Sequence, residues 1–537
     1  MKTRNRFATL AGSAAVIAFA GACNPDLNVT NPNAPDVQRA ISTPSDVRQL
    51  IGSSYNTWYL GMQGCANDNC EPVPGIATEV MADVMTMAYG NFGARFNGQE
   101  PRLAYNNSSA AGDGFVASSP YDAMYGALGA ANDGLKAIDR GIEVRASASA
   151  PDETEAFQAF AWMIQGLSLG FEALVFDKGF VVTEDTPENS AVLEPYAAVN
   201  AAAVASLDKT IAAATGKTWS IPVEFTPGIT LTAANLAKMA NTMAARQLAY
   251  VPRNATENAA VNWGRVLSYA DKGISIGTPF DLRIQGDGGN TWYDIYKGYV
   301  NLSAWVRVDQ RIVQEADPTQ PLVFTSTTSP ARAVPADLRW SRGSPDASGN
   351  VRQPGADFVF YASIPYDPAR GVYFFGNWAH ARYRAHSYEV SPAFTTAVPY
   401  VLAAENDLLI AEALVRTNGD KNRAAELVNK TRVTRGGLPP VTAATPTAEF
   451  LGAIFYERDV ELWGTGAARG WFDRRRIDPT VTYNGLPIGN IWASRGGSNL
   501  QKGTPRSLPV PAKELETLGL PVYTFGGNAP NPIFPET

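Results

Sequence analysis

Histidine and cysteine are almost missing from this 537-residue sequence, which contains two histidines, His380 and His386, and three cysteines. Most protein sites for zinc and related metals draw their ligands from these two residue types. The histidines lie six residues apart and in no zinc-binding pattern, and neither a P-loop nor a dinucleotide-binding glycine pattern occurs. We therefore expect no bound metal and no cofactor.

Charge is also scarce, and what there is leans to the acidic side. Charged residues make up 18% of the chain and the formal net charge is −7. Binding to nucleic acid depends on a clear excess of basic side chains, so nucleic acid is an unfavourable partner. The 45% of hydrophobic residues can form a large core, whereas 47 glycines and 37 prolines favour long loops.

The N-terminus has the features of an export signal. Three basic residues precede a short apolar stretch, Ala8–Ala22, which is too short for a comfortable transmembrane helix of about 20 residues. The stretch ends in "AGAC", which resembles the cleavage and lipidation motif of bacterial lipoproteins. We predict a signal peptide over 1–22, lipidation of Cys23 and an extended tether over 23–38. The alternative is an ordinary secretory signal with an incidental cysteine.

The remaining cysteines, Cys65 and Cys70, lie close together in "CANDNC". Export would place them in an oxidising compartment, where disulfides form and persist. We predict a local disulfide that closes this loop. Two free thiols, or a weak metal loop that also uses Asp68, are the alternatives.

Helical periodicity dominates two parts of the chain, 39–274 and 399–537. Apolar residues recur there at helical spacing, in helices joined by short turns. Such recurring helix pairs predict a mainly α protein with TPR-like packing. Between them, residues 275–398 form a loop-rich, aromatic region in which "FVFYASIPYD" and "GVYFFGNW" indicate a few short strands.

The most charged segment is "YERDVELWGTGAARGWFDRRRI", Tyr456 to Ile477. Arg458 falls within the apolar stripe of its predicted helix, four residues from Ile454 and from Leu462. A buried arginine has to be paired with a carboxylate, because an unpaired buried charge is very costly. We therefore predict a buried structural ion pair of Arg458, with Glu412, Glu461 and Asp473 as the candidate partners.

Two other functions are compatible with these patterns. Glu457 and Glu461, one helical turn apart, could be the acid and base of a secreted glycoside hydrolase, provided that they face an open cleft. The helix pairs could also form a scaffold whose only partner is another protein.

Aromatic residues in the irregular segments are the candidate ligand-binding groups. Sugar rings stack their apolar faces on aromatic side chains, while asparagine and charged groups bind the hydroxyls, and loops on a rigid scaffold commonly carry such sites. We select the following as ligand-binding candidates: Tyr89, Asn91, Phe92, Tyr105, Trp292, Tyr293, Tyr296 and Trp340.

Several motifs occur in a fixed order toward the C-terminus. They are "AENDLLIAEALVRTNGD", an N-x-x-R pair at Asn429 and Arg432, "YERDVELW", "WFDRRR" and "SLPVPAKEL". With the lipoprotein-like N-terminus, this set resembles the SusD/RagB family of outer-membrane nutrient-binding lipoproteins. The resemblance is strongest over about 400–515, and the irregular region has no motif from which ligand residues can be transferred.

The resemblance implies a mainly α, SusD-like fold of TPR-like helix pairs with a loop-rich half. It also implies a protein that is not an enzyme. Members are lipid-anchored at the outer membrane and face the cell exterior. They capture oligosaccharides, or in some cases peptides, and deliver them to a SusC-like TonB-dependent transporter.

Overall fold

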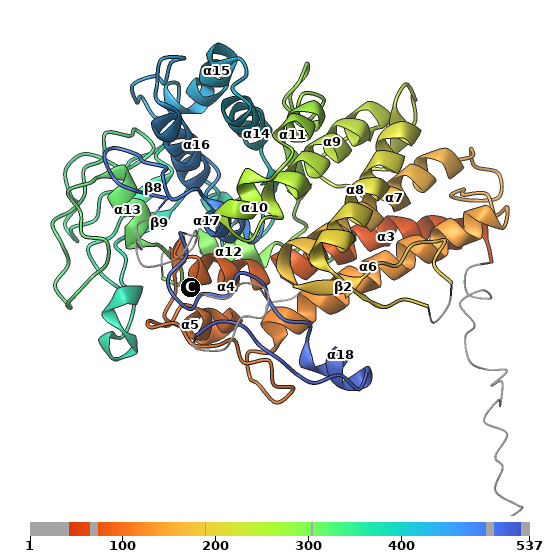
Figure 1. Ribbon diagram of the computed structural model, residues 1–537, viewed down its shortest axis with the longest axis horizontal. Coiled ribbons are helices and arrows are strands. Elements are labelled where there is room, and N and C mark those ends of the chain that lie inside the picture. The colour runs from red at the N-terminus through yellow and green to blue at the C-terminus, as the bar shows by residue number, and fades with distance from the viewer. Residues whose placement is uncertain (1–41, 65–72, 188–189, 302–303, 490–498, 528–537) are drawn as a thin grey trace, which may run out of the picture.

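The structure, a computed structural model, describes residues 42–64, 73–187, 190–301, 304–489 and 499–527. Helices account for most of its regular structure (Figure 1), which confirms the predicted mainly α fold class. The longer helices are α3 (Pro44–Gln63), α4 (Pro74–Met81), α6 (Phe115–Asp139), α7 (Thr154–Val175), α8 (Tyr196–Ala214), α9 (Ala233–Tyr250), α11 (Trp263–Ala270), α14 (Ala403–Arg416), α15 (Lys421–Arg432), α16 (Thr447–Glu461) and α17 (Arg469–Arg476).

Local sequence signals define where some of these helices begin. Thr43 caps α3, because its hydroxyl accepts a hydrogen bond from the amide of Asp46 while the Asp46 carboxylate accepts one from the amide of Thr43. This reciprocal capping box satisfies two amides that a helix start leaves unpaired. Pro44 occupies the first helical position, where its missing N–H costs nothing.

The long helices pack in sequence as a curved row (Figure 1). α3 contacts α6, α6 contacts α7, α7 contacts α8, and α8 contacts α9; α11 then joins α9 to α14, which packs on α15 and α16. Small residues allow close approach between them. A methyl group on Gly134 of α6 would lie 2.3 Å from the Ile51 side chain of α3, and one on Gly166 of α7 would lie 2.7 Å from Leu207 of α8.

The loop-rich region lies beside α16 at one end of this row (Figure 1). Its strands pair only in twos, for example β8 with β9, where Phe358 lies opposite His380. Two short helices that the sequence pattern does not predict, α12 (Ile295–Val300) and α13 (Gln310–Ala316), interrupt the loops. The strands are β1 (Met85–Thr86), β2 (Lys178–Phe180), β3 (Leu193–Pro195), β4 (Ser220–Ile221), β5 (Leu231–Thr232), β6 (Leu282–Gln285), β7 (Arg307–Val308), β8 (Phe358–Phe360), β9 (Trp378–His380) and β10 (Ala397–Val401).

Short elements complete the fold around these segments. They are η1 (Asn91–Gly93), α5 (Ala94–Asn97), α10 (Ala255–Ala259), η2 (Pro368–Arg370), η3 (Val372–Phe374), η4 (Arg384–His386) and α18 (Ala512–Thr517). None of the described helices is both long and apolar enough to cross a bilayer.

One hydrophobic core joins the helical row to the loop-rich region. Trp58 of α3 and Trp471 of α17 belong to the same buried cluster as Trp340 and Trp378 from the loops. Large aromatic side chains bury much apolar surface, and together they offset part of the entropy lost when segments with little regular structure become ordered. The loops are therefore fixed on the helices by a shared interior.

Glu79 of α4 is a carboxylate inside this interior. Its Oε1 accepts a hydrogen bond from the Gly470 amide at 3.0 Å, while its Oε2 has no hydrogen-bond partner among the described residues. Burial raises the pKa of Glu79 to about 7 from an ordinary value of 4.5. Because the folded state then binds a proton more tightly than the unfolded chain, this group stabilises the fold increasingly as the pH falls from about 7 toward 4.5.

Replacing Glu79 with glutamine should therefore stabilise the protein at pH 8, by up to about 3 kcal/mol, since a pKa shift of one unit corresponds to about 1.4 kcal/mol. Glutamine keeps an oxygen for the Gly470 amide but carries no charge. Urea unfolding at pH 8 and pH 4.5 measures the effect, which should vanish at the lower pH. Glu449→Gln, an exposed change on α16, is the control, and an unchanged stability of Glu79→Gln at pH 8 would contradict this account.

Candidate functional site

The Arg-rich C-terminal segment is part of the scaffold. Arg458 is fully buried, and its guanidinium lies 3.2 Å from the Glu412 carboxylate and 3.3 Å from that of Asp473. Arg476 binds the same two carboxylates at 2.7 and 2.6 Å. We call Glu412, Arg458, Asp473 and Arg476 the Arg458 cluster. The buried and paired Arg458 agrees with its place on the apolar stripe.

Glu461 is not a partner of Arg458, so this part of the prediction is wrong. The Glu461 carboxylate binds Arg339 at 3.2 Å and Arg382 at 2.9 Å, and it also binds Arg435. All three arginines come from outside α16. The spacing along one helix did not show that Glu461 faces these loops rather than the helices behind it.

The hydrolase alternative fails on the same carboxylates. Glu457 and Glu461 are both buried. Arg339 binds Glu457 at 2.7 Å, and the Thr431 hydroxyl donates a second bond to it at 2.7 Å. A glycosidase pair has to flank an open cleft that admits a sugar and a water molecule. These two side chains instead hold arginines inside the fold.

Most of the candidate aromatic residues are also interior. Trp340 is fully buried, and its ring stacks on Phe358 at 4.3 Å and meets Trp378 edge-on at 5.0 Å. The same correction applies to Phe92, Trp292, Tyr293 and Tyr296; each of them, like Tyr105, is at least nine-tenths buried. They hold their loops to the core, because each large aromatic side chain buries much apolar surface there.

Tyr89 belongs to a partly exposed group of aromatic rings. Its ring lies 5.1 Å from that of Trp305, which lies 5.3 Å from Tyr299, and Tyr299 in turn stacks on Tyr388 at 6.0 Å and 26°. Tyr388 is 50% exposed and the other three are partly exposed. We call Tyr89, Tyr299, Trp305 and Tyr388 the aromatic platform. Asn91, another candidate, is partly exposed two residues beyond Tyr89.

Buried rings support the aromatic platform from below. Phe92 meets Tyr299 edge-on at 5.0 Å, Tyr366 meets Tyr89 at 5.7 Å, and Phe394 meets Tyr388 at 6.0 Å. Because these neighbours already fix the platform rings, the rings lose little conformational freedom when a ligand stacks on them. Less of the binding free energy is therefore spent on ordering side chains. Phe92 therefore serves the platform as a support rather than as a contact.

Polar groups border the platform. The Arg370 guanidinium lies 5.5 Å from the centre of the Tyr89 ring. Arg384 pairs with Glu389, next to Tyr388, and donates a hydrogen bond to the Tyr361 hydroxyl at 3.1 Å. Aromatic faces bordered by arginine, carboxylate and hydroxyl groups can stack on a ring and bind its hydroxyls.

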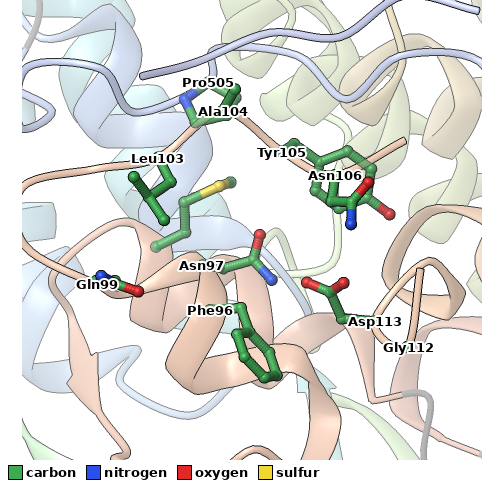
Figure 2. Close-up of a pocket in the computed structure, with 11 residues that line it drawn as sticks. Phe96, Asn97, Gln99, Leu103, Ala104, Tyr105, Asn106, Gly112, Asp113 and Pro505 are labelled. Carbon is green, nitrogen blue, oxygen red and sulfur yellow. The ribbon is translucent and has the colours of Figure 1, made fainter. Parts of the chain in front are cut away.

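A separate cavity of about 330 Å³ lies between α5, the start of α6 and the C-terminal segment near Pro505 (Figure 2). Tyr105 lines it, and its hydroxyl is held by the carbonyl of Gly114 at 3.1 Å and the amide of Ala117 at 3.2 Å. Burial raises the pKa of Tyr105, so this hydroxyl stays protonated at neutral pH.

The histidines are packing residues. His380 and His386 are buried, and burial lowers the pKa of each ring. The His380 Nδ1 lies 2.9 Å from the Asn301 side-chain oxygen. No group of three or more potential metal ligands of the His, Cys, Asp or Glu type is found in the part of the chain that the structure describes. Cys23, Cys65 and Cys70, with the predicted lipidation and disulfide, lie outside that part.

Comparison with known proteins identifies the C-terminal region. Residues 386–516 match the model of the SusD family, and this range contains the Arg458 cluster. This C-terminal region is therefore assigned to the SusD family. No curated protein sequence matches the chain.

Solved structures of SusD-like proteins share the fold over most of the chain. A SusD superfamily protein from Parabacteroides distasonis superposes with a TM-score of 0.58 at 14% identity, covering 88% of this chain and 96% of that one. The surface glycan-binding protein A from Bacteroides uniformis gives 0.54 at 15%, covering 88% and 98%. A SusD-like carbohydrate binding protein from Bacteroides vulgatus gives 0.51 at 14%, covering 82% and 85%.

Proposed function

We propose that this SusD-family protein captures oligosaccharides at the cell surface on its aromatic platform, without catalysing a reaction on them. The observation that carries the proposal is the linked row of Tyr89, Trp305, Tyr299 and Tyr388, partly exposed and supported by buried rings. Exposed aromatic surface of this kind is typical of binding sites. Two of the solved structures that share its fold are named as glycan- or carbohydrate-binding proteins.

The proposal includes a lipid anchor and a transporter partner. The "AGAC" sequence before Cys23 favours an outer-membrane lipoprotein that faces the cell exterior. The SusD family resemblance favours a SusC-like TonB-dependent transporter as the protein that receives the ligand. Co-purification of such a transporter with the membrane-extracted protein tests this part independently of sugar binding.

Trp305→Ala should weaken glycan binding by roughly tenfold or more. A nucleic-acid base stacked on an aromatic side chain contributes about 1–3 kcal/mol to binding, and we expect a similar contribution when a sugar ring stacks on Trp305. Each 1.4 kcal/mol changes the dissociation constant by a factor of ten. Affinity gel electrophoresis against a panel of neutral and acidic polysaccharides, followed by calorimetry with oligosaccharides and peptides, measures the loss. Tyr388→Ala should act in the same direction.

Val223→Ala is the matched control, because Val223 is 63% exposed and follows β4 on the helical part of the molecule. It should leave binding unchanged. If no polysaccharide binds the wild-type protein, or if Trp305→Ala binds as tightly as wild type, the platform is not the capture site. Binding of peptides alone would reassign the ligand class.

A further inference from the structure

The cavity in Figure 2 has the size and shape of a small-ligand site. Its volume, about 330 Å³, falls at the lower end of the roughly 300–1,000 Å³ that ligand pockets occupy. A cavity of this size accommodates one ring rather than several. The lining residues are Met81, Phe96, Asn97, Gln99, Leu103, Ala104, Tyr105, Asn106, Gly112, Asp113 and Pro505.

Three polar side chains converge in the cavity from different segments. Asn97, Asn106 and Asp113 point toward one another across the open space (Figure 2). Each retains hydrogen-bonding capacity. The Asn97 amide nitrogen donates to the Gly93 carbonyl at 2.8 Å, which leaves its oxygen as an acceptor.

The other two members complement that acceptor. The Asn106 oxygen accepts a hydrogen bond from the Ser108 amide at 3.2 Å, which leaves the Asn106 amide nitrogen as a donor. The Asp113 carboxylate has a hydrogen bond with the backbone of its own residue, and no bond between it and the side chain of another described residue is found. An amide donor, an amide acceptor and a carboxylate together match the hydroxyls of a sugar ring, because a hydroxyl both donates and accepts.

Apolar side chains flank this polar group. Phe96 is 52% exposed and Leu103 is 58% exposed, and both line the cavity. Large apolar side chains that stay exposed beside a polar cavity mark binding surfaces more often than isolated ones do. A ring that stacks on Phe96 would bring its hydroxyls to the amides and the carboxylate.

The cavity and the platform are separate sites connected by one turn. No platform residue lines the cavity. Phe92 in η1 supports Tyr299 of the platform, whereas Phe96, four residues later, lines the cavity. The backbone is kinked between them at Phe92 and Gly93, which have positive φ angles of 61° and 69°. A methyl group at Gly93 would lie 2.4 Å from the Val116 side chain, so this turn is tightly packed.

We propose that the cavity lined by Phe96, Asn97, Asn106 and Asp113 is a second binding site, which accepts a single neutral sugar ring. The ligand class rests on the proposed function above, whereas the position rests on the cavity itself. The Asp113 carboxylate repels a uronate, so the cavity discriminates against acidic rings. A calcium ion needs six to eight oxygen ligands and gains nothing from an exposed phenylalanine. This lining therefore fits a sugar better than a cation.

The test uses the platform variant Trp305→Ala/Tyr388→Ala, so that only the cavity can bind. Saturation-transfer NMR with glucose, galactose, mannose and N-acetylglucosamine at millimolar concentrations should detect at least one neutral sugar. Adding Asp113→Ala should weaken that binding roughly tenfold, since a lost hydrogen bond to a charged group costs about 1.5–3 kcal/mol. Adding Phe96→Ala should weaken it by a similar factor, because the sugar ring loses the side chain on which it stacks. Asp113→Asn should remove the discrimination against glucuronate, which loss of packing alone would not do.

Val223→Ala in the same background is the control, and circular dichroism verifies that each variant is folded. The proposal is overturned if none of the four sugars binds the platform variant. It is also overturned if binding survives Phe96→Ala and Asp113→Ala, or if EDTA abolishes it, which would indicate a cation site. Because the platform is tested separately with Trp305→Ala and polysaccharides, failure of one site can be told from failure of the other.

Discussion

Glu412→Gln is expected to destabilise the protein by about 3–5 kcal/mol, a large part of the roughly 5–15 kcal/mol that holds a typical fold together. Glu412 is fully buried and is shared by three arginines. Its carboxylate binds Arg476 at 2.7 Å, Arg416 at 2.9 Å and Arg458 at 3.2 Å. Glutamine keeps the shape but removes the charge, so Arg458 and Arg476 retain Asp473 as a buried counter-charge, whereas Arg416 loses its carboxylate partner.

The pH dependence of the same residue provides a second measurement. Burial acts to raise the pKa of Glu412, but Arg476, Arg416 and Arg458 together hold it well below the ordinary value of 4.5. A depressed pKa stabilises the fold above the unfolded value and loses that contribution as the pH falls below about 4.5. Wild type should therefore lose stability in acid more steeply than Glu412→Gln, the opposite sign to the Glu79 effect.

Urea unfolding at pH 7 and pH 4 measures both effects. Glu426→Gln on the neighbouring helix α15 is the matched control, because Glu426 is exposed and its loss should change stability by no more than about 0.5 kcal/mol. If Glu412→Gln unfolds at the same urea concentration as wild type at pH 7, the Arg458 cluster does not fasten the scaffold.

The cluster shows which parts of the structure the sequence could predict. Helical periodicity placed Arg458 among Ile454 and Leu462, and the cost of an unpaired buried charge then required a carboxylate. Both steps depend only on neighbours within one helix and on general energetics. The choice between Glu412, Asp473 and Glu461 depends on how helices cross, and there one of the three predicted partners was wrong.

The aromatic residues show where sequence reasoning stops. Tyr296 is buried and Tyr299 is partly exposed, although both belong to α12 and have the same residue type. Their difference arises from contacts with segments far away in the chain, such as Phe92 and Tyr388 beside Tyr299. Irregular segments have no period that separates an inner from an outer face, so Trp305 and Tyr388 gave no signal.

Arg339→Met should also cost about 3–5 kcal/mol, because Arg339 connects the loop-rich region to helix α16. Its guanidinium binds Asp337 in its own loop at 2.7 Å and the Glu457 and Glu461 carboxylates of α16 at 2.7 and 3.2 Å. Glu461 keeps Arg382 and Arg435 when Arg339 is removed. Asp337 would keep the backbone amide of residue 339 and the Tyr456 hydroxyl, each at 2.9 Å, and Glu457 would keep the Thr431 hydroxyl at 2.7 Å.

The effect of Arg339→Met should begin in the loop. Hydrogen exchange should quicken first around Trp340 and β8, whose packing on α16 depends on this link, while α7 and α8 keep their protection. Arg352→Met is the control in the same region, because Arg352 is 51% exposed and forms a surface pair with Asp346 at 2.9 Å. A surface pair of this kind contributes about 0–1 kcal/mol.

A double substitution separates lost charge pairing from lost packing in Arg339→Met. If the cost arises from the orphaned carboxylate, Glu457→Gln should destabilise the wild-type protein but restore part of the stability of Arg339→Met, because it removes a charge that no longer has a partner. The two changes would then be strongly non-additive, by about 1–3 kcal/mol. Additive losses would mean that the methylenes of Arg339 and the shape of the site, rather than the buried charges, hold the loop-rich region against α16.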